Sequence, residues 1–119
     1  MIKFNSPIII ENVWKLCLVT KKELLDIYYE DKNTEKKEEI KAVIEFTTST
    51  IYIDKELDDE TLLKQLRNKL VHLYLWETGQ QNRLFNEEEL CDLASVTIPT
   101  IYKMAENLLQ RVKNEDKEE

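Results

Sequence analysis

The stretch TLLKQLRNKLVHLYLWETG, residues 61–79, predicts the central helix of the fold. Asp58 or Asp59 can cap its start and complement the positive end of the helix dipole, and Gly79 is a typical stop signal. The helix carries a main apolar stripe and further apolar residues that point away from that stripe. We therefore expect it to be buried on more than one side, between a sheet and a C-terminal helix. The main apolar stripe recurs at helical spacing and consists of Leu62, Leu66, Leu70 and Leu73.

Three positions in this helix correspond to the metal-binding motif H-E-x-x-H, in which two His bind zinc and the Glu is the general base. Here they are Asn68, Lys69 and His72. Asn68 and His72 lie about 40° apart on one helix face, but an amide oxygen is a weak zinc ligand. Lys69 is protonated at neutral pH, so it cannot act as a base and repels a cation. His72 is the only His in the chain, whereas a catalytic zinc site needs three protein ligands.

Residues 43–110 resemble the small zincin-like proteins of bacteriophages, distant relatives of the SprT-like and ImmA-like metallopeptidases. The resemblance rests on TIYIDKEL before the helix, LRNKLVHLYLWETG within it and LFNEEELCDLAS after it. The helix of that family typically reads L-R-H-E-L-x-H-A-Y-L-x-E-x-G, so this chain departs at two of the three motif positions. The resemblance implies a zincin-like fold with a substrate-binding edge strand beside the helix. It also implies an acidic third ligand at Glu89, with Glu88 as the runner-up.

Each of these site residues has a simpler interpretation. Asn86 and Glu89 have the spacing of a capping box, which would open a helix without any metal. His72 would then be a hydrogen-bonded, partly buried histidine left from an ancestral site. Because the motif is degenerate, we expect no catalytic residue, no metal and no cofactor.

A chain of 119 residues, 42% of them hydrophobic, suits a single domain with a real core. We assign residues 1–113 to a zincin-like domain and residues 114–119 to a charged C-terminal tail that should fray. No stretch has the run of about 20 apolar residues that a membrane helix needs, and no signal-peptide layout is present. We therefore expect a protein of the bacterial host cytoplasm without a membrane partner. Cys17 and Cys91 are expected to be small buried hydrophobes.

Acidic residues outnumber basic ones by 24 to 17, which gives a net charge of −7. This charge disfavours direct binding to nucleic acid, which requires Lys and Arg. It favours a protein partner that is itself basic, such as a nucleic-acid-binding host protein. The simpler alternative is that the charge keeps the protein soluble, and the sequence leaves the oligomeric state open. The expected acidic binding surface comprises Glu56, Asp58, Asp59, Glu60, Glu87, Glu88 and Asp92.

Outside the central helix, strands are expected early in the chain and helices later. Residues 1–20 suggest one or two short strands, and residues 42–54 a hairpin or one long kinked strand. Residues 21–30 suggest a short helix and residues 31–41 a charged loop. A third helix should open at Asn86, stop near Pro99 and be followed by a last helix. We therefore predict an α+β fold, with a small N-terminal antiparallel or mixed sheet packed on three or four helices, resembling a minimal zincin.

These patterns leave three hypotheses for the function. The leading one is a catalytically inactive zincin-like phage protein that binds a macromolecule, for example as an inhibitor of a host defence nuclease of the anti-CRISPR type. The second is a metal-dependent peptidase with nonstandard ligands, formed by His72, Glu89 and either Cys91 or Asp92. The third is a small structural or regulatory phage protein.

Overall fold

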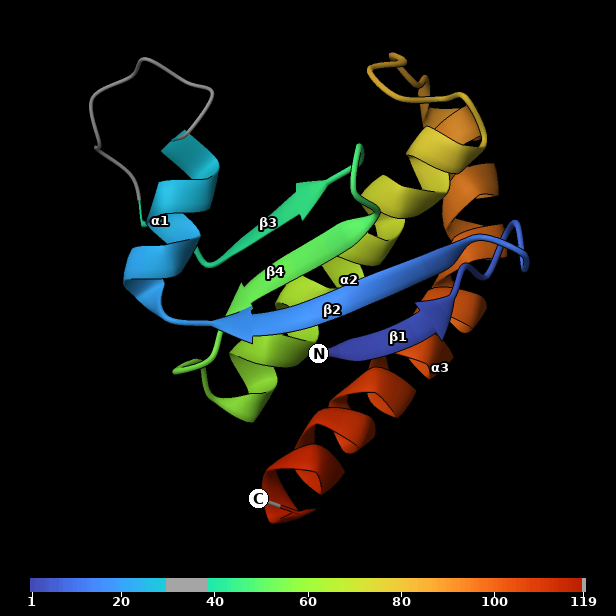
Figure 1. Cartoon of the computed structure of the whole chain (residues 1–119). Helices are drawn as coiled ribbons and strands as arrows, with labels where there is room; N and C mark the ends of the chain where they lie inside the picture. Colours follow the sequence, from blue (N-terminus) through green and yellow to red (C-terminus); the bar gives the residue numbers. More distant parts are fainter. Residues whose placement is uncertain (30–38, 119) are drawn as a thin grey trace.

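The protein has an α+β fold in a computed structural model that describes residues 1–29 and 39–118 (Figure 1). Within these residues, four strands form one mixed sheet and three helices accompany it. The predicted fold class is therefore confirmed. In chain order, the elements are β1 (Ile2–Asn5), β2 (Val13–Val19), α1 (Lys21–Tyr29), β3 (Ala42–Glu45), β4 (Thr50–Asp54), α2 (Asp59–Glu77) and α3 (Glu87–Glu118).

The sheet has the strand order β1-β2-β4-β3, so β1 and β3 are its two edges. β1 and β2 are antiparallel, β2 and β4 parallel, and β4 and β3 antiparallel. The pair β3–β4 shows that residues 42–54 form the hairpin rather than the single kinked strand. Because side chains alternate along a strand, every second one points into the core. These inward residues are Ile2, Phe4, Trp14, Leu16, Ile51 and Ile53.

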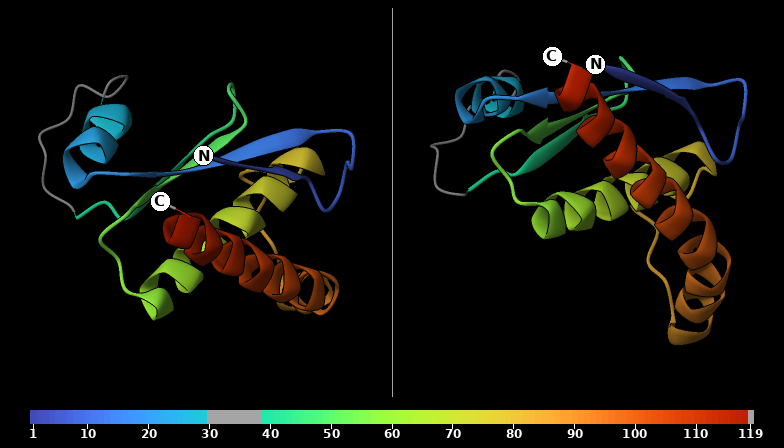
Figure 2. Two further views of the ribbon diagram at one scale, coloured as in Figure 1. Left: turned by 60° about the horizontal axis from the view of Figure 1, so that its bottom comes forward. Right: turned by 90° about the horizontal axis from the view of Figure 1, so that it is seen from below.

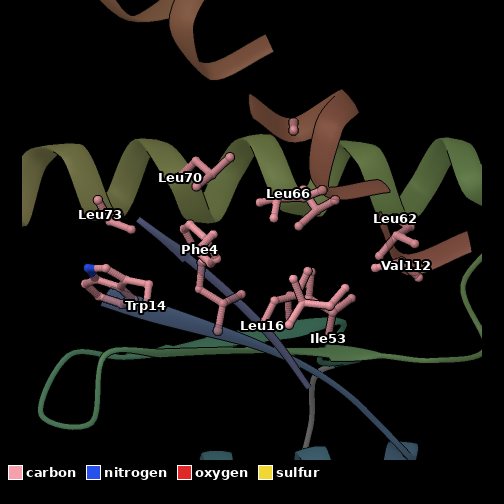
Figure 3. Close-up of a cluster of buried hydrophobic side chains, with 14 of the residues drawn as sticks. Phe4, Trp14, Leu16, Ile53, Leu62, Leu66, Leu70, Leu73 and Val112 are labelled. Atoms are coloured by element: carbon pink, nitrogen blue, oxygen red, sulfur yellow. The ribbon is translucent and has the colours of Figure 1, made fainter. Parts of the chain in front are cut away.

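α2 packs on the sheet through the predicted leucine stripe, as Figure 3 shows. Leu66, Leu70 and Leu73 are fully buried, and Leu62 is 6% exposed. Burying one such side chain contributes about 1.5–3 kcal/mol. The stripe therefore accounts for the central place of this helix.

Both predicted ends of α2 are confirmed. Asp58 is the N-cap, because its Oδ1 accepts a hydrogen bond of 2.7 Å from the backbone N–H of Thr61. At the other end, Gly79 adopts a φ of 72°. Glycine takes this left-handed conformation without the steric cost of a Cβ atom.

The larger helices lie on one side of the sheet (Figure 2). α2 and α3 form a layer beneath the strands, whereas α1 stands at one end of the sheet beside β3 and β4. α1 confirms the helix predicted over residues 21–30, whose last residue lies outside the described residues, as does most of the loop predicted over residues 31–41. The face that α3 adds to the core consists of Ile101, Ala105, Leu108 and Val112.

α3 is one helix of 32 residues, so the predicted break at Pro99 was wrong. Pro99 lies inside the helix, where a proline removes one backbone hydrogen bond and costs about 3 kcal/mol. The carbonyl that loses its donor belongs to exposed Ser95 and can accept from water instead. The buried face that follows Pro99 outweighs this local cost. The helix also continues through residue 118, so residues 114–118 are part of α3 rather than a separate tail.

The two cysteines differ from the prediction in their burial. Cys17 is half-buried in β2, and Cys91 is exposed on α3; both are free thiols. Most residues between 87 and 100 are exposed, with Thr97 as the buried one. The first turns of α3 therefore leave Cys91 outside the core, which a pattern of apolar residues alone does not reveal.

Candidate functional site

A cleft of about 500 Å³ opens beside the C-terminal half of α2. We call it the β3 cleft, because residues 42–46, which include all of β3, line it together with α1, α2 and the loop after α2. Lys69 and His72 both line this cleft, so the structure brings together two of the three motif positions. Asn68 lies one turn before His72 and is exposed.

Lys69 is half-buried in the β3 cleft, and this burial lowers the pKa of its ammonium group. The ion pairs found among the described residues do not involve Lys69. Within the described part of the chain, the cleft therefore presents a positive charge that has no carboxylate partner.

His72 is exposed as a whole residue where it lines the cleft, but its ring is partly shielded from solvent. Partial burial of its ring, and then the neighbouring charge of Lys69, lower the pKa of the imidazole below its usual 6.5. The shift therefore favours the neutral form of the ring. No hydrogen bond joins the ring to a described residue, so the expected hydrogen bond is absent among these residues, whereas the expected partial burial of the ring is present. The hydrogen bond is absent because this side of α2 faces an open cleft.

β3 gives the cleft an edge strand of the sheet. Its only strand neighbour in the sheet of described residues is β4. Alternate backbone N–H and C=O groups of an edge strand have no partner strand. The β3 cleft can therefore offer a row of main-chain donors and acceptors next to Lys69. An extended segment of another protein binds such an edge by strand addition.

An aromatic stack beside the cleft was not predicted from the sequence. The rings of Phe46 and Trp76 are stacked, with centroids 5.1 Å apart and an interplanar angle of 22°. Trp76 is 37% exposed, and buried Trp14 meets it edge-on. The sequence feature that could have indicated an aromatic residue near the cleft is spacing. Trp76 follows His72 by four residues and therefore shares its helix face.

Glu89, the expected third metal ligand, caps α3. Its backbone N–H donates a hydrogen bond of 2.8 Å to Oδ1 of Asn86. In return, its Oε1 accepts a hydrogen bond of 3.4 Å from the backbone N–H of Asn86. The other carboxylate oxygen forms an ion pair with Arg83. The reciprocal bonds confirm the capping-box interpretation of this residue.

Glu89 and His72 lie on different sides of α2. Glu89 and Asp92 line a separate groove together with Tyr74 of α2. Tyr74 points about 160° away from His72 around the axis of α2. Among the described residues, no three His, Cys, Asp or Glu side chains gather closely enough to hold one metal ion. The residues therefore do not fit the zinc site that the resemblance implies, either with Glu89 or with Asp92 or Cys91 in the third position.

The expected acidic surface is divided into two clusters. The α2 acidic cluster lies at the N-terminus of α2, and the α3 acidic cluster at the N-terminus of α3 (Figure 1). A helix of 19 residues, about 28 Å long, separates them. Acidic side chains also stabilise helix N-termini, so part of this acidity has a purely structural explanation. All members are exposed: Glu56, Asp58, Asp59 and Glu60 in the first cluster, and Glu87, Glu88 and Asp92 in the second.

Comparisons with protein-family profiles, with curated proteins and with solved structures gave no match to this chain. The similarity to zincin-like phage proteins therefore stays a prediction made from the residues. No helix in the described residues is both long enough and apolar enough to cross a membrane.

Proposed function

We propose that this protein is a catalytically inactive, zincin-like phage protein whose β3 cleft receives an extended segment of a partner protein. One observation carries the proposal. The cleft combines a strand edge with the motif face of α2, but Lys69 occupies the base position, and Glu89 lies on a different side of the helix. Such a cleft can hold a chain by main-chain hydrogen bonds. At the motif position of the carboxylate base, which would activate a metal-bound water, it has the ammonium group of Lys69 instead.

The partner that we propose is a basic, nucleic-acid-binding protein in the cytoplasm of the bacterial host. A nuclease of a host defence system, inhibited in the manner of an anti-CRISPR protein, is the concrete case. The net charge of −7 supports this choice. The two acidic clusters at the ends of α2 would attract such a partner, and this attraction accelerates association most strongly at low salt.

Inhibition of purified CRISPR nuclease–guide RNA complexes tests this target class. The protein is added before the target DNA, and cleavage is measured at low and moderate salt. We expect the wild type to inhibit, and neutralisation of the contacting cluster to weaken inhibition most at low salt. Asp58 stays unchanged in both variants because it caps α2. The two variants are Glu87→Gln/Glu88→Gln/Asp92→Asn and Glu56→Gln/Asp59→Asn/Glu60→Gln.

The two cluster variants are controls for one another, because each removes three negative charges. If only one loses inhibition, that cluster contacts the nuclease. If both inhibit as well as the wild type does, the acidic mechanism is wrong. A wild-type protein that inhibits no nuclease would instead support the third hypothesis, a structural or regulatory role.

A further inference from the structure

A second groove, of about 880 Å³, lies between the free edge of β1 and the middle of α3. We call it the β1 groove. It lies at the opposite edge of the sheet from the β3 cleft (Figure 1). Its apolar lining includes buried Phe4 and Leu108 and half-buried Met104. The groove therefore has an apolar floor beside an edge strand, in which Met104 is more accessible than Phe4 and Leu108.

The charges of the β1 groove are the reverse of the overall charge. Lys3, Lys103 and Arg111 line it, and all three are exposed. None of the described residues that line it is acidic. In a chain with 24 acidic and 17 basic residues, three positive charges around one apolar groove mark a surface that is complementary to an anion.

On this side, β1 directs the backbone groups of alternate residues away from β2. Lys3 is paired with Lys15 of β2, whose N–H donates to the carbonyl of Ser49, away from β1. Lys3 and Lys15 are therefore a pair without mutual hydrogen bonds, and the N–H and C=O of Lys3 point to the free edge. Arg111 confirms this direction, because its Nη2 donates a hydrogen bond of 2.8 Å to the Lys3 carbonyl. Since such pairs alternate, Asn5 also directs its backbone groups outward.

We propose that the β1 groove binds an extended, acidic segment of a partner protein as an additional strand beside β1. The outward backbone groups of Asn5 and the outward N–H of Lys3 supply main-chain hydrogen bonds, whereas the Lys3 carbonyl already accepts one from Arg111. Alternate side chains of the segment then contact the apolar floor, while its carboxylates face Lys3 and Lys103. The apolar floor favours a peptide over nucleic acid, whose binding rests mainly on phosphate contacts.

The size of the groove limits the segment that fits. The part of α3 that lines it runs from Pro99 to Arg111, which is about 18 Å at 1.5 Å per residue. Extended chain rises by about 3.3 Å per residue, so about five residues fill the groove. This binding site does not depend on the proposed function, because it uses a different edge of the sheet and selects the opposite charge.

A peptide titration of the full chain tests the proposal. The probe is a synthetic peptide of about seven residues that alternates Asp and Val, slightly longer than the groove. A peptide with Lys in place of Asp and a thymidine oligonucleotide are the matched probes. Binding is followed by amide chemical shifts. We expect the acidic peptide alone to bind, with the largest shifts at Lys3 and Asn5, and with weaker binding at higher salt.

Two exposed lysines provide matched variants. Lys103→Glu reverses a charge in the groove, whereas Lys64→Glu makes the same change on α2, away from the groove. We expect Lys103→Glu to weaken binding of the acidic peptide about tenfold or more, which corresponds to losing one good charged contact. Lys64→Glu should change it by less than about twofold, because only screened long-range charge is altered.

Several outcomes would overturn the proposal. Equal loss with Lys103→Glu and Lys64→Glu would show that only overall charge matters. Equal or tighter binding of the oligonucleotide would assign the groove to nucleic acid. Concentration-dependent dimerisation that is abolished by Lys103→Glu would assign it to a second copy of this chain. A lack of shifts at Lys3 and Asn5 would exclude strand addition.

Discussion

At the residue scale, Lys69 distinguishes this cleft most clearly from a zinc site. Its ammonium is one of the two causes that lower the pKa of His72, after burial of the ring. We expect Lys69→Met to raise the His72 pKa toward 6.5 without reaching it, because the burial remains. His72 is the only His in the chain, so an NMR titration reports on this ring alone. Lys64→Met, an exposed change on the same helix, should leave the titration unchanged.

The same pKa shift predicts how stability depends on pH. The folded state holds the His72 pKa below its unfolded value. At pH values between the folded and the unfolded pKa, the folded protein therefore binds fewer protons than the unfolded protein. The contribution of His72 to stability is therefore lost as the pH falls below about 6.5. In Lys69→Met this loss should be smaller, as measured by urea unfolding at several pH values. An unchanged His72 titration in Lys69→Met would show that the two side chains do not share one electrostatic environment.

Restoration of the motif tests the position of Glu89. Asn68→His/Lys69→Glu recreates H-E-x-x-H, yet Glu89 stays on another side of α2 and remains bound to Asn86 and Arg83. We expect zinc titration to give no tight site, because two His ligands without a third protein ligand fall short of a catalytic site. Glu89→Gln in that background is the control and should leave zinc binding unchanged. Tight zinc binding that depends on Glu89 would contradict this geometry.

At the element scale, the start of α3 depends on the capping box. Asn86→Ala should lower the free energy of unfolding by about 1 kcal/mol, as N-cap deletions typically do. Glu89→Gln should cost less, because Gln also serves at this capping-box position. Urea denaturation measures both, with Glu87→Gln as a control for charge in the first turn. A larger loss in Glu89→Gln than in Asn86→Ala would mean that the Arg83 ion pair dominates.

The helices also show where local sequence rules hold and where they do not. The ends of α2 were predictable because a cap such as Asp58 and a stop such as Gly79 act within one turn. The continuity of α3 was not predictable, because the local cost of Pro99 competes with burial against residues far away in the sequence. Capping by Glu89 was predictable from its distance to Asn86. Its separation from His72 depends on how α3 returns along α2.

At the scale of the whole molecule, spacing along the sequence reveals neither the order of the strands in the sheet nor the way the acidic residues are distributed over the surface. Strand existence followed from alternating apolar residues, but the order β1-β2-β4-β3 depends on a parallel pairing between distant segments. Among the described residues, that order leaves β1 and β3 with one strand neighbour each, and these two edge strands line the β1 groove and the β3 cleft. The acidic residues were predicted as one surface. They form two, because the N-termini of successive helices lie at opposite ends of α2 (Figure 1).

Binding without cleavage at the β3 cleft is tested most directly by quantitative affinity capture from the lysate of a CRISPR-carrying bacterial host. Three baits are compared: the wild type, His72→Glu in the cleft, and Lys64→Gln, which also makes the charge more negative by one but lies outside the cleft. Intact-mass analysis identifies the captured proteins. We predict that one basic nuclease is recovered at full length by the wild type and Lys64→Gln, and is lost with His72→Glu. Recovery of cleaved fragments, or equal recovery by all three baits, would contradict a non-catalytic binding cleft.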